Sequence, residues 1–549
     1  MIPSLKADSD AVRQLQTLSG GFSGCRRTAS RTILGSMTTR WTKERLHDLV
    51  TARMRGVRLI AVSNREPYIH VREEDGIRCQ VPASGLTTAI DPILRASHGC
   101  WVAHGSGNAD RIVVDGRNRI AVPPENPSYH LRRVWLSKEM EDEYYYGLSN
   151  EGLWPLCHIA FHLPKFSSKH WASYRRVNEL FAKAVLEEAA GNAAVVFVQD
   201  YHLALLPRML KRANPNLMVA QFWHIPWPNR ETFRAFPWKE ELLDGMLGND
   251  LLGFHTRHHC HNFLDTIDRN IEALVETERS TIRRSGHDTL VRPYPISIDS
   301  DAYNTRAASL SEAETGRWYD EIGYRPEILG IGIDRIDYTK GIPQRIEAVD
   351  RLLSEHPEYI GRFTFLQVGV PSRVAISAYD DLNRQTSDLV NRVNARWSRG
   401  SWKPIVFVHR HVDQGALIAL NLIADFCAVT SLHDGMNLVA KEFVASRIDE
   451  DGVLVLSAFT GAARELSDAL IVNPFSVEEI AAAMHAAIGM PAEERRRRMS
   501  RMRRVVSEHN VYRWAGKILS ELASMYERQA GAGRATLRIA ALAGSGEAA

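Results

Sequence analysis

The feature that most constrains the fold is a regular alternation of short apolar runs with helix-forming segments. Runs at 194–198, 217–223 and 250–254 each end in polar or turn-forming residues, and a helix-forming segment at 203–212 follows the first of them. Runs this short and this rich in valine, phenylalanine and leucine are typical of buried strands. Strands that alternate with helices pair in parallel, so the pattern predicts a doubly wound α/β sheet.

A second series of the same kind follows a break in the chain. Residues 291–298 contain two prolines, which favour a connection between domains. Beyond this break, strands are predicted at 327–333, 363–368, 404–408, 424–430, 452–456 and 469–472. A chain of 549 residues is also too long for one hydrophobic core. The sequence therefore predicts two Rossmann-like, doubly wound domains.

The composition of the two ends differs from that of the rest. We expect a mobile N-terminal extension at 1–40, a first domain at 41–297, a second domain at 298–505, a C-terminal helix at 506–530 and a disordered tail at 531–549. The extension is rich in serine, threonine and arginine and shows little periodicity, and the tail is rich in alanine and glycine. Met37 is an alternative start, because a first ordered helix is predicted directly after it; a transit peptide is disfavoured by Asp8 and Asp10.

Charge and cysteine content point to a cytoplasmic protein. A formal net charge of +3 gives no strong field for nucleic acid or a membrane surface. No apolar run approaches the roughly 20 residues of a membrane span, and the N-terminus lacks the apolar core of a secretion signal. The six cysteines form no Cys-x-x-Cys pair, which favours reduced thiols. Whether the chain forms a homo-oligomer is left open.

A group of histidines at 255–261 raises the question of a metal site. His255, His258, His259 and His261 surround Cys260, but no acidic residue with metal-ligand spacing follows. A solvated helix start is the favoured interpretation. We therefore expect no metal and no cofactor.

Positive side chains follow two successive strands of the second domain. Arg335 and Lys340 come directly after the strand at 327–333, and Arg373 follows the next strand. Singly, each could form an ordinary surface ion pair. At successive strand ends they would face one cleft, where parallel sheets bind ligands. Such cations stabilise the negative charge that builds on a departing diphosphate, so the sequence predicts a diphosphate site.

The stretch from Asp434 to Glu442 predicts a second half of this site. It follows the strand at 424–430, turns at Gly435 and continues into helix-forming sequence. The N–H groups at a helix N-terminus suit a phosphate or a polyhydroxyl ligand. The alternative is a helix cap at Asp434 and a solvated Glu442. Asp200 and His224 also stand at strand ends, in the first domain.

Together these stretches resemble the trehalose-6-phosphate synthase family of retaining glycosyltransferases. The matching residues are 63–65, 84–86, 145–155, 200–203, 224–226, 252–256, 334–341 and 434–442. The resemblance covers about residues 57–530, and its last two stretches are the most specific. It implies a GT-B fold, in which two Rossmann-like domains enclose the active site in the cleft between them.

The resemblance also implies roles for individual residues. The implied donor-binding residues are Gly85, His224, Arg335, Lys340, Asp434, Met436, Asn437, Leu438, Val439 and Glu442. The implied acceptor-binding residues are Arg65, Tyr145, Trp154, Asp200 and Arg373. Asp200, His224, Arg335 and Lys340 are the candidate catalytic residues. The implied reaction moves glucose from a nucleotide-glucose, with UDP-glucose favoured, to glucose 6-phosphate, through positioning and charge stabilisation without an enzymic nucleophile.

Three positions depart from the family pattern. Ser84 stands where the family has glycine, His104 where it has a second tryptophan, and His433 where it has arginine. These departures leave open a different phosphorylated acceptor, such as glycerol 3-phosphate or a cyclitol phosphate, and a non-catalytic sensor of sugar phosphates. The nucleobase is not fixed by any motif. No Asp-x-Asp-Gly-Thr phosphatase motif follows the second domain.

Overall fold

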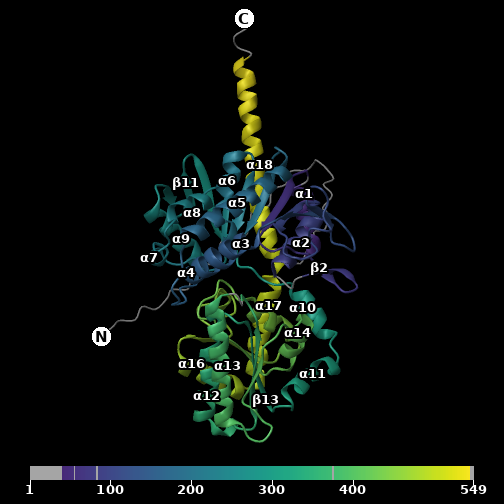
Figure 1. Ribbon diagram of the computed structural model, residues 1–549, viewed down its shortest axis with the longest axis vertical. Helices are drawn as coiled ribbons and strands as arrows, with labels where there is room; N and C mark the ends of the chain where they lie inside the picture. The colour runs from purple at the N-terminus through teal and green to yellow at the C-terminus, as the bar shows by residue number, and fades with distance from the viewer. Residues whose placement is uncertain (1–39, 55, 82–84, 374–375, 545–549) are drawn as a thin grey trace, which may run out of the picture. The chain divides into compact units, whose positions relative to one another are not determined.

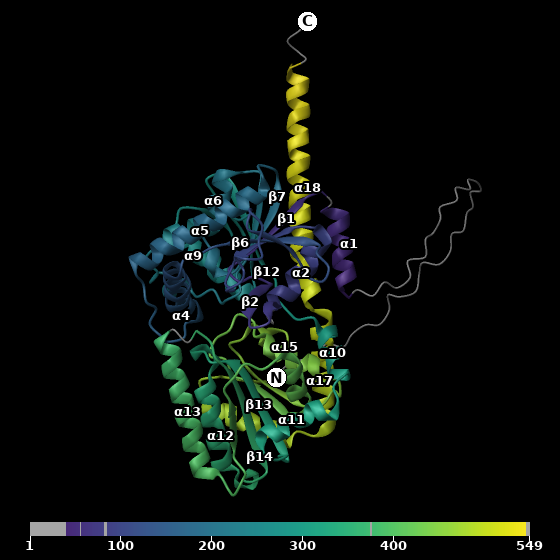
Figure 2. The same cartoon turned by 45° about the vertical axis from the view of Figure 1, so that its right-hand side comes forward.

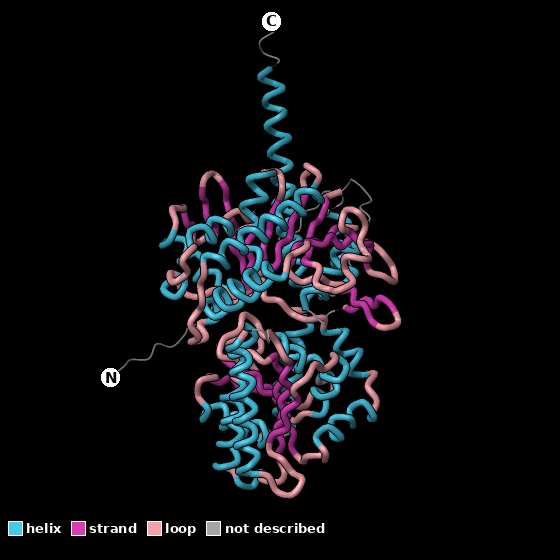
Figure 3. The backbone as a smooth tube through the Cα atoms, in the orientation of Figure 1, coloured by secondary structure: helices cyan, strands magenta, loops and turns pink. Residues whose placement is uncertain are grey.

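The computed structural model describes residues 40–544 apart from 55, 82–84, 374 and 375. Residues 40–549 form one compact unit, and its first and second lobes each contain a large sheet covered by helices (Figures 1 and 3). The predicted extension at 1–40 and the alternative start Met37 lie outside the described residues, apart from Arg40. The prediction of two doubly wound sheets is confirmed.

The first lobe contains a ten-stranded sheet with the order β10-β11-β12-β9-β8-β7-β1-β4-β6-β5. Its strands are β1 (Arg58–Ser63), β4 (Cys100–His104), β5 (Arg119–Val122), β6 (Tyr129–Val134), β7 (Ala194–Gln199), β8 (Met218–Phe222), β9 (Leu251–Phe254), β10 (Leu274–Glu276), β11 (Thr281–Arg284) and β12 (His287–Pro293). The strands from β12 to β6 pair in parallel, whereas β5 at one edge and β10 and β11 at the other pair antiparallel. A separate hairpin joins β2 (Ile69–Glu73) to β3 (Gly76–Gln80).

Helices cover both faces of this sheet. They are α1 (Lys43–Arg53), α2 (Gly85–Ser97), α3 (Lys138–Glu141), the π-helix η1 (Asp142–Leu153), α4 (Trp154–His158), α5 (Ser168–Ala189), the 3-10 turn η2 (Tyr201–Leu203), α6 (Leu206–Ala213), α7 (Arg230–Phe233), α8 (Lys239–Met246) and α9 (Arg257–Asn270). Strand β1 is buried on both sides: Leu59 and Ala61 join one apolar cluster, and Ile60 and Val62 join another. This explains why a central parallel strand is apolar throughout its length.

The second lobe contains a six-stranded, fully parallel sheet with the order β15-β14-β13-β16-β17-β18. Its strands are β13 (Ile328–Arg335), β14 (Phe363–Val370), β15 (Ile405–Val408), β16 (Phe426–Val429), β17 (Val453–Ser457) and β18 (Leu470–Val472). Its helices and 3-10 turns are α10 (Ser300–Ala308), α11 (Glu312–Ile322), η3 (Tyr338–Lys340), α12 (Ile342–Glu355), η4 (Pro357–Tyr359), α13 (Ser377–Trp397), α14 (Gln414–Ile423), α15 (Leu438–Ser446), η5 (Gly461–Arg464), α16 (Val477–Gly489) and α17 (Ala492–Glu508).

The last helix, α18 (Val511–Gly544), packs against the first lobe (Figure 2). It contacts α1 and α2, and Trp514 lies against Phe197 and Phe222 of the central strands. A β-carbon on Gly516 would lie 2.2 Å from the Trp41 ring, so the close approach of the chain before α1 to α18 depends on this glycine.

The prediction of a disordered tail at 531–549 is wrong up to Gly544, because α18 continues that far. The segment is rich in alanine, which has the highest helix propensity and can extend a helix that is already nucleated. Residues 545–549 lie outside the described residues.

Two further findings concern the environment of the protein. Within the described part of the chain, no helix combines the length and the apolar character that a membrane crossing needs. The five described cysteines are all free thiols, and four of them are buried.

Candidate active site

Two adjoining cavities lie at the carboxyl ends of the strands, and each is lined by residues of both lobes. The Trp154 cavity measures about 290 Å³ and is lined by Ser63, Asn64, Arg65, Tyr145, Trp154, His158, Gln199, Asp200, Tyr201, His202, His224, Ile225, Arg335, Lys340, Arg373 and Asp434. The α15 cavity measures about 420 Å³ and is lined by His224, His255, Ile296, Asp334, Arg335, Lys340, Asp434, Met436, Asn437, Leu438 and Val439. They share four residues, His224, Arg335, Lys340 and Asp434. Ligands bound in the two cavities would therefore meet at these residues.

The α15 cavity is built on the start of α15. Strand β16 ends before the turn at Gly435, and Asn437 then caps the helix by accepting a hydrogen bond from the N–H of Ala440. Asn437 has a φ of +70°, an uncommon conformation that aims its side chain back at the first turn. The lining residues Met436 to Val439 therefore bring the N–H groups and positive dipole end of the helix to the cavity wall.

Lys340 and Asp434 form an ion pair at the junction of the two cavities. Lys340 Nζ lies 2.5 Å from Asp434 Oδ2, which also accepts from the Asn437 amide at 3.2 Å. Burial alone would raise the pKa of Asp434, but the charge and hydrogen bond of Lys340 outweigh it and lower the pKa to about 2. Lys340 is therefore already partnered. A diphosphate that binds it must share the ammonium with Asp434.

Arg373 is fixed in place with one edge of its guanidinium free. Nη1 donates to Asp337 at 3.1 Å and contacts the Tyr379 hydroxyl, and the guanidinium carbon lies 4.0 Å from the Trp154 ring centroid. Nε is buried without a hydrogen-bond partner, and no partner for Nη2 occurs among the described residues. Nε and Nη2 form the edge that binds a phosphate with two parallel hydrogen bonds.

The first lobe supplies a second arginine to the Trp154 cavity. Arg65 follows β1 and donates from Nη2 to the Tyr145 hydroxyl at 3.1 Å. Burial would raise the pKa of the Tyr145 phenol, but the positive charges of Arg65 and Arg373 outweigh it and lower the pKa. Tyr145 stacks on His202 with the ring centroids 5.5 Å apart. Two arginines and a phenol thus converge on a space that suits a phosphate group.

Asp200 and His224 stand side by side at the ends of β7 and β8. The N–H of His224 donates to Asp200 Oδ1 at 3.1 Å, and Asp200 has a φ of +71°. Burial raises the pKa of Asp200 to about 7. Burial also lowers the pKa of His224, so its imidazole is neutral at pH 7. This pair offers neutral or weakly acidic hydrogen-bonding groups rather than a strong nucleophile.

Unpartnered polar atoms are concentrated in these cavities. Those that are buried, lack a hydrogen-bond partner and belong to lining residues are Asn64 Oδ1, Trp154 Nε1, Gln199 Nε2, His202 Nε2, His255 Nδ1 and Arg373 Nε. Buried polar atoms are nearly always satisfied in folded proteins. Such a group therefore indicates a polar ligand with many hydroxyl or phosphate oxygens.

The loop before α15 contacts the first lobe directly. His433 Nδ1 lies 2.7 Å from the carbonyl oxygen of His158. A β-carbon on Gly435 would lie 2.9 Å from the carbonyl oxygen of His224, so only glycine allows this approach. Lys441 Nζ donates to the carbonyl oxygen of Ile296 at 2.8 Å. These contacts place α15 against the strand ends of the first lobe.

Glu442 and His104 are not among the described residues that line the cavities. Gly85 is the first residue of α2, but the preceding residues 82–84, which include Ser84, lie outside the described residues. Glu442 is not among the described residues that line either cavity; it is half-buried beside Tyr303, and its partial removal from water raises its pKa. His104 ends β4 with Nδ1 3.2 Å from the carbonyl oxygen of Val134, and it also lies outside both linings.

Sequence reasoning missed several lining residues and misplaced two histidines. His158 and Ile296 line the cavities without having been singled out, and Tyr201, His202, His255 and Asp334 line them although sequence reasoning assigned none of these four a role in substrate binding. Most of them stand beside a predicted strand end, which was an available signal. The solvated helix start proposed for the histidine group is wrong for His255 and His259, which are 3% and 4% exposed because the loop carrying His433 packs against them.

One group of residues with metal-ligand character lies away from the two cavities. Within the described residues, the one group close enough to hold a metal ion is His356, Glu358 and His485, which lies between η4 and α16. None of these residues lines the two cavities.

Two doubly wound lobes, with cationic and sugar-sized cavities shared between them, define a glycosyltransferase of the GT-B fold. The sequence profile of glycosyltransferase family 20 matches residues 57–524. The chain belongs to this family, which is the trehalose-6-phosphate synthase family.

Individual relatives are similar over most of their length. The trehalose-6-phosphate synthase of Mycolicibacterium vanbaalenii is 39% identical over 482 residues, which cover 86% of this chain and 97% of the relative. The UDP-forming alpha,alpha-trehalose-phosphate synthase of Botryotinia fuckeliana is 34% identical, covering 86% and 90%.

Solved structures agree with this assignment. The UDP-forming synthase of Burkholderia xenovorans in complex with glucose-6-phosphate superposes with a TM-score of 0.75 at 32% identity, covering 85% of this chain and 100% of that one. An E. coli structure with UDP-2-fluoro glucose bound gives a TM-score of 0.76 at 31% identity, covering 85% and 99%.

Proposed function

We propose that the protein transfers glucose from UDP-glucose to glucose 6-phosphate with retention of configuration and releases trehalose 6-phosphate and UDP. The observation that carries this proposal is the pair of adjoining cavities that share His224, Arg335, Lys340 and Asp434. A donor in one cavity and an acceptor in the other would meet at these residues. Relatives named as UDP-forming and a solved relative with bound glucose-6-phosphate support the two substrates.

The α15 cavity is the proposed donor site. Arg335 and Lys340 bind the diphosphate together with the N–H groups at the start of α15. Asp434 and Asn437 contact the glucose hydroxyl groups. Gly85 and Glu442 are proposed as further donor contacts.

The Trp154 cavity is the proposed acceptor site. The free Nε–Nη2 edge of Arg373 and the guanidinium of Arg65 bind the acceptor phosphate, and Tyr145 donates or accepts beside it. Trp154 packs against the Arg373 guanidinium and holds it in the cavity. Asp200 orients the acceptor hydroxyl groups. His104 does not line this cavity, so the tryptophan it replaces supplies no argument for a different acceptor.

The proposed chemistry needs no enzymic nucleophile. The bond between glucose C1 and the diphosphate oxygen breaks as the acceptor hydroxyl attacks C1 from the same face. The proton of that hydroxyl passes to the departing diphosphate oxygen. Arg335 and Lys340 stabilise the charge that develops on the diphosphate, and neutral His224 holds a hydroxyl of the reacting sugar. The free thiols of the described cysteines support a cytoplasmic location for this reaction.

Release of UDP from UDP-glucose tests the proposal. Purified full-length protein is incubated with UDP-glucose and one phosphorylated acceptor at a time: glucose 6-phosphate, glycerol 3-phosphate or a cyclitol phosphate. We expect release only with glucose 6-phosphate and an α,α linkage in the product by NMR. If UDP is released only with another acceptor, glucose 6-phosphate is not the acceptor. If UDP is released with none of the acceptors, the protein is not a glucosyltransferase of this kind.

A further inference from the structure

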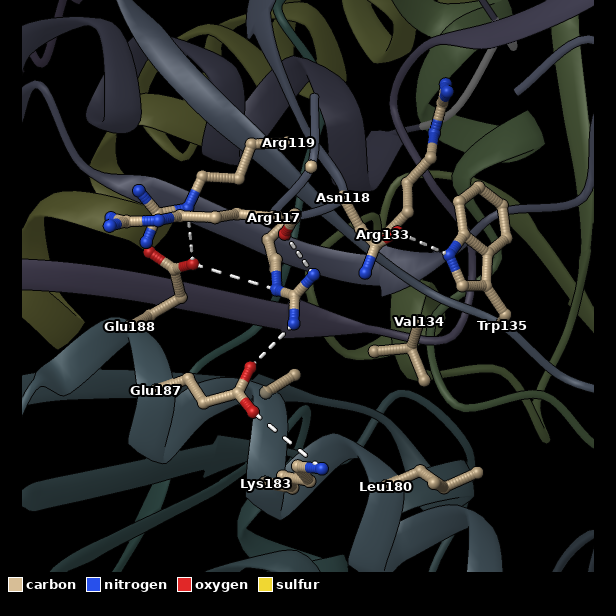
Figure 4. A pocket seen from close by; sticks show the side chains of 13 residues that line it. Arg117, Asn118, Arg119, Arg133, Val134, Trp135, Leu180, Lys183, Glu187 and Glu188 are labelled. Carbon is tan, nitrogen blue, oxygen red and sulfur yellow. Dashed lines mark hydrogen bonds and ion pairs between the residues drawn. The ribbon is translucent and has the colours of Figure 1, made fainter. Parts of the chain in front are cut away.

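A third cavity, of about 690 Å³, lies on the first lobe between the edge of the sheet and α5 (Figure 4). Strands β5 and β6 form one wall and the C-terminal half of α5 forms the other. We call it the arginine cavity, after Arg117, Arg119 and Arg132, which line it. None of its lining residues belongs to the Trp154 cavity or the α15 cavity. The proposed reaction therefore gives it no role.

Positive charge exceeds negative charge in the arginine cavity. Glu188 is 2% exposed; its carboxylate lies 2.8 Å from Arg119 Nε and 3.8 Å from Arg132 Nε. Glu187 lies 2.6 Å from Arg132 Nη2 and 4.0 Å from Lys183 Nζ. Figure 4 shows the two glutamates on one side, with Arg119 and Lys183 reaching toward them.

Arg117 adds a fourth cation to the lining, so the two glutamates leave an excess of two positive charges. Arg58 contacts Glu188 from outside the lining at 2.9 Å and uses part of the capacity of that carboxylate. Arg133 belongs to the wall, but Glu66 and Asp110 neutralise it.

Several guanidinium donors in the cavity have no protein partner. A guanidinium carries five N–H donors in a rigid fork. Arg119 uses Nε on Glu188, and no hydrogen bond from its two terminal nitrogens occurs within the described residues. The guanidinium of Arg117 likewise donates no hydrogen bond to any described residue. Donors with this geometry bind phosphate oxygens in pairs.

We propose that the arginine cavity binds a small phosphorylated metabolite, with its phosphate on Arg117 and Arg119, which lie together at one end of the cavity (Figure 4). The cavity volume lies within the range of small-molecule sites. Val134, Leu180 and Ala184 form an apolar wall for the carbon skeleton of the ligand. A phosphate ester can contact both the cationic side chains and the apolar wall, whereas free phosphate can contact only the cationic side chains.

A ligand at this site is connected to Arg65 of the Trp154 cavity. Arg132 lines the arginine cavity, and its neighbour Arg133 donates from Nε to Glu66 at 2.9 Å. Glu66 directly follows Arg65 and accepts from the N–H of Ser106 at 2.8 Å. A ligand that shifts β6 therefore shifts the group that fixes the loop carrying Arg65. This part of the inference rests on the proposed function and predicts a change in KM for glucose 6-phosphate.

Calorimetric titration of the full-length protein with 3-phosphoglycerate tests binding without turnover. The variant Arg117→Ser/Lys183→Ser removes two exposed cations of the cavity. Arg176→Ser, on the same helix as Lys183 and paired with Glu179, is the matched control. All titrations are repeated in an Arg373→Ala background to remove binding at the Trp154 cavity. We expect the double variant to weaken the remaining binding at least about tenfold and the control to leave it unchanged.

Inorganic phosphate is titrated in the same background. If 3-phosphoglycerate binds more tightly than inorganic phosphate, the site also recognises the carbon skeleton of the ligand. Equal affinities would show that it recognises phosphate alone and would refute the proposal of a metabolite site. Binding that is absent in the Arg373→Ala background, or unchanged in the double variant, would overturn the site.

Kinetics test the connection separately. We expect 3-phosphoglycerate to change KM for glucose 6-phosphate at least about threefold, with a smaller change in kcat, and to lose this effect in Arg117→Ser/Lys183→Ser. Binding without a change in KM would refute the connection between the arginine cavity and Arg65, but not the binding site itself. Binding in a protein that shows no turnover would leave this site standing and refute the proposed function instead.

Discussion

Replacement of Arg373 by lysine separates charge from geometry in the Trp154 cavity. Arg→Lys keeps the positive charge but removes the planar fork. In the structure, Nη1 holds Asp337 while the Nε–Nη2 edge remains free, and the guanidinium stacks on Trp154 at 4.0 Å. An ammonium group cannot hold Asp337, stack on Trp154 and donate two parallel hydrogen bonds to a phosphate at once.

Two magnitudes follow from these contacts. One charge-assisted hydrogen bond to the phosphate is lost, worth about 1.5–3 kcal/mol, and ordering a flexible lysine costs about 1 kcal/mol more. A loss of about 3 kcal/mol raises KM for glucose 6-phosphate about 150-fold at 25 °C. Loss of the buried cation–π contact lowers the free energy of unfolding separately, by about 2 kcal/mol.

The assay is steady-state release of UDP at varied glucose 6-phosphate, with denaturant unfolding in parallel. We expect the large change in KM for glucose 6-phosphate and little change in KM for UDP-glucose. Arg410→Lys is the control, because Arg410 pairs with Glu321 at 3.0 Å on the exposed surface of the second lobe. A folded Arg373→Lys protein whose KM for glucose 6-phosphate rises less than about threefold would refute the assignment of the free edge to the acceptor phosphate.

Three further predictions concern the same site. Lys340→Ala should lower kcat about 10²–10³-fold, because it removes a charge at the departing diphosphate, and a near-normal kcat in a protein with a native circular dichroism spectrum would contradict the diphosphate role of Lys340. Burial raises the pKa of Asp200 to about 7 in the folded state, so the folded protein binds a proton that the unfolded chain releases above about pH 4, and stability should fall as pH rises from 4 to 7. Asp200→Asn should flatten that fall in denaturant unfolding at each pH, and an unchanged slope would show that Asp200 is ionised throughout. His433→Phe should lower the free energy of unfolding by about 1–2 kcal/mol, because it leaves the buried carbonyl oxygen of His158 without its partner, and an unaltered midpoint in denaturant would rule out this contact between the lobes.

The central strands could be predicted because their physics is local. A parallel strand covered on both faces has a continuous run without polar side chains, as at 59–62 in β1 and 328–333 in β13. The edge strands escaped this reasoning. Strand β3 is exposed at four of its five positions, so it contains no apolar run to detect. The extension of α18 to Gly544 was missed because glycine-rich composition was given more weight than the alanines between the glycines.

Several residues that line the candidate site could be predicted from the sequence, but their ion pairs and backbone conformations could not. Residues at strand ends converge because parallel strands share one edge, which places Arg335, Lys340 and Arg373 together. The pairing of Lys340 with Asp434 joins residues 94 positions apart, and no local pattern encodes it. Backbone conformations with positive φ at Asp200 and Asn437 are likewise set by tertiary structure, because neither residue type requires them.

The packing of α18 against α1 and the first sheet has a consequence for biosynthesis. The apolar cluster that contains Leu46 and Ala61 also contains Trp514, Ile518 and Leu522. The first lobe leaves the ribosome long before these last residues are made. At about 5–20 residues per second, roughly 220 residues separate the two events by about 10–45 s. During that interval the part of the first lobe that α18 covers is exposed, so a ribosome-associated chaperone has a defined surface and a defined time in which to act.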